Sequence, residues 1–357
     1  MQKVTFLGKS GFYSEVKARV DEYFTANNIS PYADRRMKLK TGVILTGLVA
    51  SYIFFLMSGS SLVWTLIAAI AVGQGFVLVG FNIMHDGAHG SYSNNRKLNW
   101  LMGFSLDLIG GSSFFWHYKH NILHHTYTNI DGVDDDIDVF GILRFSPEQP
   151  WRRWHRFQHL FALPLYSLLM LQVFISDFIK FVTGKVGSYK IPRPNITEST
   201  LFLVTKLFYL SYVVLIPLFF LPLLNVLIFF VVVNAIVGFT MATVFQLAHV
   251  MEDNAFPRPE EATGVIDNEW AIHQVETTAN FKPTSKLVSW YCGGLNFQVE
   301  HHLFPKICHI HYPEISKIVE RTCEQFQINY VSYPRLRDAV RTHFRFLKKL
   351  GKVPTPA

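Results

Sequence analysis

Two long stretches of the chain carry no charged residue and no histidine, and they dominate its hydrophobic pattern. The first covers residues 41–84 and the second covers residues 207–248. A membrane-spanning helix needs about 20 apolar residues, so each stretch is long enough for two spans. We therefore predict two helical hairpins, with spans over residues 41–57 and 62–84 and over residues 203–222 and 226–248.

The breaks and flanks of these stretches predict their orientation. Residues 58–61 (SGSS) and residues 222–225 (PLLN) offer turns between the paired spans, and the first titratable residues afterwards are His85 and His249. The basic run at residues 35–40 precedes the first span, and basic residues close to a span mark the cytoplasmic side. Because each hairpin enters and leaves on that side, we expect both histidines to face the cytoplasm.

Two other apolar stretches, residues 98–116 and 157–182, are interrupted by polar residues, glycine or proline. If either crossed the membrane alone, the later histidines would lie on the opposite face from the earlier ones. We expect both to be interfacial or partly embedded helices. The expected fold is an all-α integral membrane protein with a cytosolic amphipathic N-terminus (1–40), a membrane domain (41–310) and cytosolic basic C-terminal helices (311–357).

Composition agrees with a membrane location. Hydrophobic residues make up 50% of the chain and charged residues only 17%, against about 25% charged in soluble domains. The formal net charge of +7 favours contact with lipid headgroups, and the alternative is a docking face for an acidic partner. We expect no nucleic acid partner. The three cysteines form no CxxC motif, which predicts reduced, structural thiols.

Three short clusters of histidine carry the candidate chemistry. Spacings of three and four residues place side chains on one face of a helix, one turn apart. Each cluster alone is weak evidence, but the three together with His249 predict a metal site. The clusters are HDGAH (His85, His89), HNILHH (His120, His124, His125) and QVEHH (Gln298, His301, His302).

The number of histidines limits the kind of metal centre. A catalytic zinc takes about three protein ligands, so eight histidines are too many for one such ion and fit two metals better. Imidazole suits Zn, Cu, Fe and Ni, and the residues alone leave the metal open. A pair of redox-active metals beside a membrane would have hydrocarbon chains as its substrate. Oxidation of such chains needs oxygen chemistry.

The three clusters resemble the histidine boxes of the membrane fatty acid desaturases. The wider strings WHYKHNILHHTYTNIDGVDDD and LNFQVEHHLFP strengthen the resemblance, which spans roughly residues 40–310. The glutamine that opens the third box is similar to the front-end group, whose members desaturate between an existing double bond and the carboxyl end. QLAHVMED, which contains His249, resembles the additional histidine segment before the third box.

The resemblance implies four transmembrane helices under a cytosolic helical cap that holds a non-haem di-iron centre, with O2 as co-substrate. The implied reaction puts a cis double bond into a long-chain acyl group carried by CoA, acyl carrier protein or a lipid. No catalytic residue is expected apart from the metal ligands. By position, the implied iron ligands are His85, His89, His120, His124, His125, His249, His301 and His302, with Gln298 bound loosely or through water.

Electrons would come from a separate partner. No HPGG haem-binding motif is present, so we expect no fused cytochrome b5 and a separate donor of the ferredoxin or cytochrome b5 type. This favours a bacterial cytoplasmic membrane, with the endoplasmic reticulum as the alternative, and an active site on the cytosolic face.

Polar neighbours of the clusters have two interpretations each. Asp86 and Glu300 could hydrogen-bond the ring N–H groups of ligand histidines or point to solvent. His117 lies three residues before His120 and could touch the site. The aspartates at 134–136 could orient the second cluster, but we favour a solvated loop.

Other functions remain open at this point. A lipid or carotenoid hydroxylase of the same histidine-box superfamily would have the same spacing. A metal transporter is less favoured, because transporters place ligands near the membrane midplane and here every cluster lies beyond the spans. A lipid-binding protein without catalysis is the third alternative.

Overall fold

The structure, a computed structural model, describes residues 4–353. Within them the chain is mostly helical, and the strands form three short two-stranded pairs. Four helical segments are long and apolar enough to cross a membrane, which confirms the prediction of a mostly helical protein with four such segments. They are Arg35–Leu56, Leu62–His89, Ile196–Phe219 and Leu223–His249.

Two of these segments begin earlier than predicted because capping side chains, rather than the last charged residue, set their ends. Helix α2 (Arg35–Leu56) starts at Asp34, whose carboxylate accepts a backbone N–H of the first turn. Helix α10 (Ile196–Leu210) starts at a capping box, in which Asn195 and Glu198 exchange hydrogen bonds of 3.0 and 2.7 Å. Such caps satisfy backbone donors that have no partner inside the helix.

Wider π-helical turns interrupt two of the spans. The second span consists of α3 (Leu62–Val79), the π turn η1 (Gly80–Met84) and α4 (His85–His89), and so extends beyond the predicted end at residue 84. In the third span, α10 continues through the π turn η4 (Ser211–Leu215) and then the 3-10 turn η5 (Pro217–Phe219). Turns of this kind occur frequently at functional sites.

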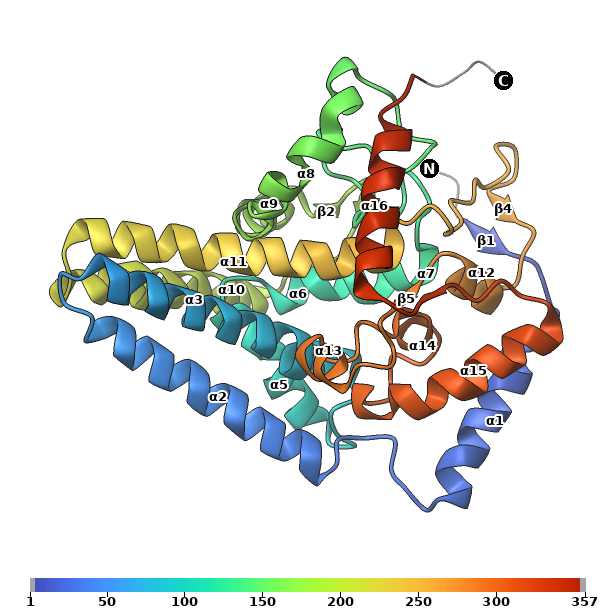
Figure 1. Cartoon of the computed structure of the whole chain (residues 1–357), viewed down its shortest axis with the longest axis horizontal. Coiled ribbons are helices and arrows are strands. Elements are labelled where there is room, and N and C mark those ends of the chain that lie inside the picture. Colours follow the sequence, from blue (N-terminus) through green and yellow to red (C-terminus); the bar gives the residue numbers. More distant parts are fainter. Residues whose placement is uncertain (1–3, 354–357) are drawn as a thin grey trace.

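The long helices lie side by side, as Figure 1 shows, with α11 (Leu223–His249) packed along α3 and with α2 on another side of α3. A stacked pair of rings, Phe55 and Phe229, lies in their core with centroids 3.5 Å apart. Gly73 lets α11 approach closely, because a Cβ there would lie 3.1 Å from Ile236. Small residues allow this close contact between membrane helices.

The two interrupted apolar stretches form shorter helices. The first gives α5 (Arg96–Leu108) and α6 (Ser113–Trp116), separated by a glycine pair. The second follows η3 (Arg153–Phe157) and gives α8 (Gln158–Tyr166) and α9 (Leu169–Thr183), and the two parts of this stretch are bent by 83°. The bent pair would add a fifth span only if both parts crossed as one.

The remaining helices gather at the end of the long helices where their histidines lie, and the N-terminal helix packs against α15 there (Figure 1). The acidic and proline-rich residues 252–264 form no helix or strand. These helices are α1 (Phe12–Ala26), α12 (Trp270–Glu276), α13 (Lys286–Tyr291), α14 (Gln298–Leu303), η6 (His309–His311), α15 (Tyr312–Phe326) and α16 (Leu336–Leu350).

Short strand pairs tie distant parts of the chain together. Two pairs are parallel and join strands near the two ends of the chain to strands between α11 and α14. The third pair is a local antiparallel hairpin after α9. They are β1 (Thr5–Phe6) with β4 (Val265–Ile266), β5 (Asn280–Phe281) with β6 (Ser332–Tyr333), and β2 (Lys185–Val186) with β3 (Tyr189–Lys190).

Candidate functional site

Two neighbouring spans deliver the first histidines. His85 and His89 lie on α4, one helical turn apart, with ring centroids 4.7 Å from each other. His249 is the last residue of α11. Because α11 packs along α3, the ends of these spans place all three residues at the same end of the bundle.

The second cluster lies in a π-helical segment rather than the expected α-helix. The segment η2 (His117–His124) is followed directly by α7 (His125–Tyr127). The rings of His120 and His124 stack with centroids 5.0 Å apart. The third cluster lies on the short helix α14, as its spacing predicted.

The structure brings all eight predicted histidines into one contiguous cluster. His85, His89, His120 and His301 form one group, in which one ring nitrogen from each residue lies within 4.8 Å of the others. A second group of the same kind contains the remaining histidines except one: His124, His249 and His302.

His125 lies between the two groups. Its ring stacks on His302 with centroids 4.3 Å apart and meets His301 at 4.6 Å. One nitrogen from each of these three residues lies within 4.8 Å of the others. The histidines are buried except for His89, which is partly exposed.

Unpartnered ring nitrogens test whether this cluster fits a metal. Buried polar atoms nearly always have a hydrogen-bond partner, and each exception needs an explanation. Every one of the eight rings has a buried nitrogen without a partner, and a metal would satisfy these lone pairs. The atoms are Nε2 of His85, His89, His120, His124, His301 and His302, Nδ1 of His249, and both nitrogens of His125.

In four of the histidines the other ring nitrogen lies against an oxygen of a neighbouring side chain. Nδ1 of His302 lies 2.8 Å from Oε1 of Gln274, and Nδ1 of His301 lies 3.4 Å from the Tyr312 hydroxyl. Ligand histidines commonly donate their second N–H in this way, which fixes the tautomer and leaves the other nitrogen for the metal. Sequence reasoning missed Gln274, because no motif surrounds it.

Two aspartates serve the second cluster in the same way, so the interpretation of residues 134–136 as a solvated loop was wrong. Nδ1 of His124 lies 3.0 Å from Asp134, and Nδ1 of His120 lies 3.4 Å from Asp136. Asp134 is buried. The run of three aspartates that begins nine residues after HNILHH was the available signal.

The Gln298 amide lies beside the second group. Its Nε2 lies 2.9 Å from Nε2 of His249, and its Oε1 is buried without a partner. The amide therefore lies beside a predicted ligand and presents a free oxygen in the same buried region.

Two predicted neighbours of the site, Asp86 and His117, have other contacts. Asp86 is buried and accepts hydrogen bonds from His309 (2.8 Å) and Cys308 (3.0 Å) rather than from a ligand histidine. His117 is exposed, lies 3.5 Å from the Asn121 amide and joins neither histidine group.

Glu300 faces away from the ligand rings. Its carboxylate accepts hydrogen bonds of 2.8 Å from Asn280 and from the Tyr330 hydroxyl. Burial raises the pKa of Glu300 to about 7, and the two hydrogen bonds oppose that rise. Since Asn280 also accepts the backbone N–H of Val299 at 3.0 Å, this network anchors the start of α14.

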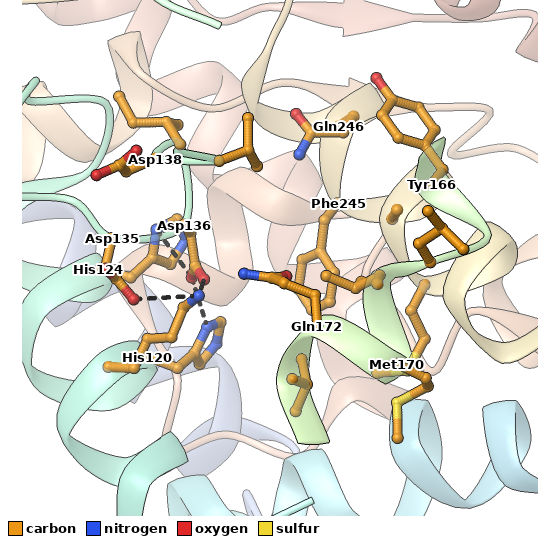
Figure 2. Close-up of a pocket in the computed structure, with 18 of the residues that line it drawn as sticks. His120, His124, Asp135, Asp136, Asp138, Tyr166, Met170, Gln172, Phe245 and Gln246 are labelled. Carbon is orange, nitrogen blue, oxygen red and sulfur yellow. Dashed lines mark hydrogen bonds and ion pairs between the residues drawn. The ribbon is translucent and has the colours of Figure 1, made fainter. Parts of the chain in front are cut away.

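A cavity of about 310 Å³ opens beside the histidines. His120 and His124 lie at one side of it, and Tyr166 and Met170 lie at the other, as Figure 2 shows. Much of the wall between them is apolar and includes Phe245. Trp116, another wall residue, stacks on His120 with centroids 4.2 Å apart.

Charged residues line the side of the cavity nearest the histidines. Lys119, on η2, bridges Asp135 (3.3 Å) and Asp136 (3.2 Å), which lie in the loop after α7. Burial opposes the charge of Lys119, but the two carboxylates outweigh burial and raise its pKa. The cavity thus combines an apolar wall with one charged side.

Comparisons with known proteins identify the family. Residues 59–334 match the family model described as fatty acid desaturase. The chain is 41% identical over 351 residues to an acyl-lipid (8-3)-desaturase of Physcomitrium patens, covering 95% of this chain and 72% of that protein. It is 38% identical over 355 residues to an sn-1 linoleoyl-lipid 6-desaturase of Synechocystis sp., covering 98% of both.

A further relative with the same name, from Arthrospira platensis, is 39% identical over 355 residues, which cover 99% of this chain and 96% of that protein. The chain belongs to the fatty acid desaturase family. It is therefore a membrane-bound oxidoreductase of lipid metabolism, and the three relatives give no support to a hydroxylase or a transporter. The family generally uses di-iron and O2, and the buried histidine groups provide donors that could hold such a centre.

Proposed function

We propose that this protein is a front-end type acyl-lipid desaturase, which introduces a cis double bond near the carboxyl end of an already unsaturated long-chain acyl group. The observation that carries the proposal is the convergence of eight histidines, each with an unpartnered buried nitrogen, beside a largely apolar cavity. The names of the relatives, two linoleoyl-lipid 6-desaturases and an (8-3)-desaturase, support the substrate class and the position.

Two iron ions would be held by the two histidine groups. The first ion would take the group that contains His85 and His301, and the second would take the group that contains His249 and His302. His125 lies between the groups and would serve either ion. Gln298 would contribute weakly, because its amide oxygen is an uncharged ligand. Its amide nitrogen lies against Nε2 of His249.

The chemistry that a bound di-iron centre supplies is removal of two hydrogens from adjacent methylenes, with O2, two electrons and two protons consumed and two waters formed. The protein's own part is to orient the ligand rings and to hold the acyl chain in a dry channel. Gln274, Asp134 and Asp136 fix ring tautomers. The wall that includes Phe245 and Met170 keeps the reacting methylenes away from water.

The partners of the enzyme follow from this chemistry. The acyl group would be carried by a membrane lipid, in line with the relatives' names, with CoA and acyl carrier protein as other carriers. Electrons would come from a separate donor of the ferredoxin or cytochrome b5 type. The formal net charge of +7 suits anionic lipids and an acidic donor.

The proposed arrangement in the membrane is two hairpins with both histidine-bearing ends on the cytosolic side. The basic residues at 35–40 support that orientation. Residues 1–40 and 311–357 would then lie in the cytosol and the domain over 41–310 in the membrane. A bacterial cytoplasmic membrane is proposed, and the two cyanobacterial relatives support a prokaryotic setting.

The decisive experiment expresses the protein in a host whose acyl chains are known, with linoleate added. Fatty acids are then profiled by mass spectrometry with localisation of each double bond. His302→Ala removes a proposed ligand, and His117→Ala is the matched control because His117 joins neither group. We expect a new double bond on the carboxyl side of the existing ones, abolished by His302→Ala and retained in His117→Ala.

Each other outcome changes the proposal in a defined way. A hydroxylated product would show that the enzyme is a hydroxylase rather than a desaturase. A double bond on the methyl side of the existing ones would overturn the front-end assignment alone. No new product, in a host with iron and a competent electron donor, would overturn the proposed acyl substrate.

A further inference from the structure

Lys180 is a buried cation in the wall of the cavity. It lies on α9, is 9% exposed, and lines the same cavity as His120 and His124. Its ammonium has three donors. The structure gives it one weak partner, the Ser176 hydroxyl of the same helix at 3.5 Å.

The carboxylates around Lys180 have other cations closer to them. Asp177 pairs with Lys206 at 2.8 Å, and Asp135 and Asp136 pair with Lys119. Among residues 4–353 no carboxylate oxygen lies within 4.0 Å of the Lys180 ammonium. Lys180 is therefore left with unused donors on the charged side of the cavity.

An unpaired ammonium in a buried position is unfavourable, because it loses water without gaining an acceptor. A ligand with an exposed oxygen would correct this. In a long-chain acyl group the polar oxygen next to the hydrocarbon is the carbonyl of its ester. The cavity thus offers a cation for the ester end and an apolar wall for the hydrocarbon.

We propose that Lys180 binds the carbonyl oxygen of the acyl ester and so fixes the carboxyl end of the substrate relative to the histidine cluster. The inference rests on the proposed desaturase function and deepens it. With its carbonyl held by Lys180, an acyl chain places the same carbons beside the histidines whatever the length of its methyl end. Lys180 is in this sense a positioning residue, because the position of the double bond is then determined by its distance from the ester carbonyl.

Amide groups share this part of the cavity. Gln172 extends across it toward Asp136 in Figure 2, and Gln246 lies nearer Tyr166. Oε1 of Gln246 is buried and has no partner. The cavity wall therefore carries polar side chains besides Lys180 that an ester group could contact.

The test uses the purified enzyme in lipid nanodiscs with a reduced ferredoxin and O2. Lys180→Met removes the charge at similar size, Lys180→Arg keeps it, and Lys185→Met is the control at an exposed site just beyond α9. The substrates are a linoleoyl glycerolipid, the corresponding thioester, and an alkyl-ether glycerolipid with the same hydrocarbon, which lacks the carbonyl. The readouts are kcat/KM, double-bond position and iron per chain.

We expect Lys180→Met to lower kcat/KM on the ester at least tenfold and to spread the double bond over neighbouring positions, with iron content unchanged. Lys180→Arg should keep the position. The ether lipid should be as poor for the unaltered enzyme as the ester is for Lys180→Met, with no further loss in that variant. The glycerolipid and thioester arms then identify which ester is used.

Several results would overturn the role of Lys180 while leaving the desaturase function intact. One is a Lys180→Met enzyme with the rate and double-bond position of Lys185→Met. If Lys180→Met fails to fold, equal kcat/KM for ester and ether lipids in the unaltered enzyme would have the same meaning. An unaltered enzyme that forms no double bond would instead reject the proposed function itself.

Discussion

The Asp134 carboxylate lies against Nδ1 of His124, with its two oxygens 3.0 and 3.1 Å from that nitrogen. Backbone N–H groups of Asn129 (2.9 Å) and Asp136 (3.0 Å) hold the carboxylate in place. The imidazole is thereby fixed with Nδ1 as the donor, and its buried Nε2 has no other partner. A loop residue thus decides which nitrogen of a histidine in the second cluster is available for metal.

Asp134→Asn should weaken metal binding, because a neutral amide holds the imidazole less firmly than a carboxylate. Loss of such a partner costs about 10–100-fold in metal affinity or activity. Iron per chain and double-bond formation are the measurements. Asp267→Asn, at an exposed position, is the control and should behave as the unaltered protein does. Equal iron content and activity in the two variants would show that His124 needs no carboxylate.

Gly293 should be intolerant of a side chain, because it touches the turn that precedes His85. Its φ is +58°, and a Cβ would lie 2.1 Å from the carbonyl oxygen of Phe81 in η1. Gly293→Ala should therefore destabilise by more than about 2 kcal/mol, since the left-handed conformation alone costs roughly 1–2 kcal/mol. Thermal unfolding in detergent measures the effect.

Gly132→Ala is the control that separates the energetic cost of the backbone conformation from that of the contact with Phe81. Gly132 also has a left-handed φ of +73°, but a Cβ there would meet nothing within 4 Å. We expect a loss of about 1 kcal/mol from the backbone alone. Equal losses in the two variants would mean that contact with Phe81 contributes nothing.

The sequence predicts the gathering of the histidines at one end of the long helices well, because spacing and hydrophobicity are local properties. His85 and His249 follow directly after long apolar runs, so the ends of two spans locate them without knowledge of the tertiary fold. The third cluster keeps its spacing on α14. The π turn of the second cluster is not visible in the residues, because the same letters are compatible with an α-helix.

Partners that are distant in sequence could not be predicted. Asp86 contacts His309, which is 223 residues away, and His302 contacts Gln274 across a helix boundary. Neither pair has a periodic signal, since only the packed chain brings them together. Lys180 likewise interrupts an apolar stretch of the sequence, and only the packed chain shows that it lines the cavity.

The buried pair of Lys206 and Asp177 should respond differently to single and double substitution. Lys206 lies 2.8 Å from Asp177 and also donates to the carbonyl of Gly110 at 2.7 Å. Removing one partner of a buried pair typically costs about 3–5 kcal/mol, because the other charge is left unpaired. Lys206→Met should therefore lower the thermal midpoint more than the double variant Lys206→Met, Asp177→Asn.

The measurement is thermal unfolding of the two single variants and the double variant, which form a double-mutant cycle. A double variant as unstable as the sum of the single variants would show that the two charges do not interact.

Loss of metal should destabilise the whole protein, because the histidine groups draw on α4, η2, α11 and α14. A ligand that binds only the folded state stabilises it by about 2.7 kcal/mol at a hundredfold excess over Kd. Protein produced under iron depletion should therefore unfold about 3–4 °C lower than the iron-loaded form. Iron added back should restore the midpoint.

His302→Ala, with a proposed ligand missing, should show a much smaller difference between the two preparations. A midpoint independent of iron in the unaltered protein would mean that the eight rings hold their positions without a bound ion.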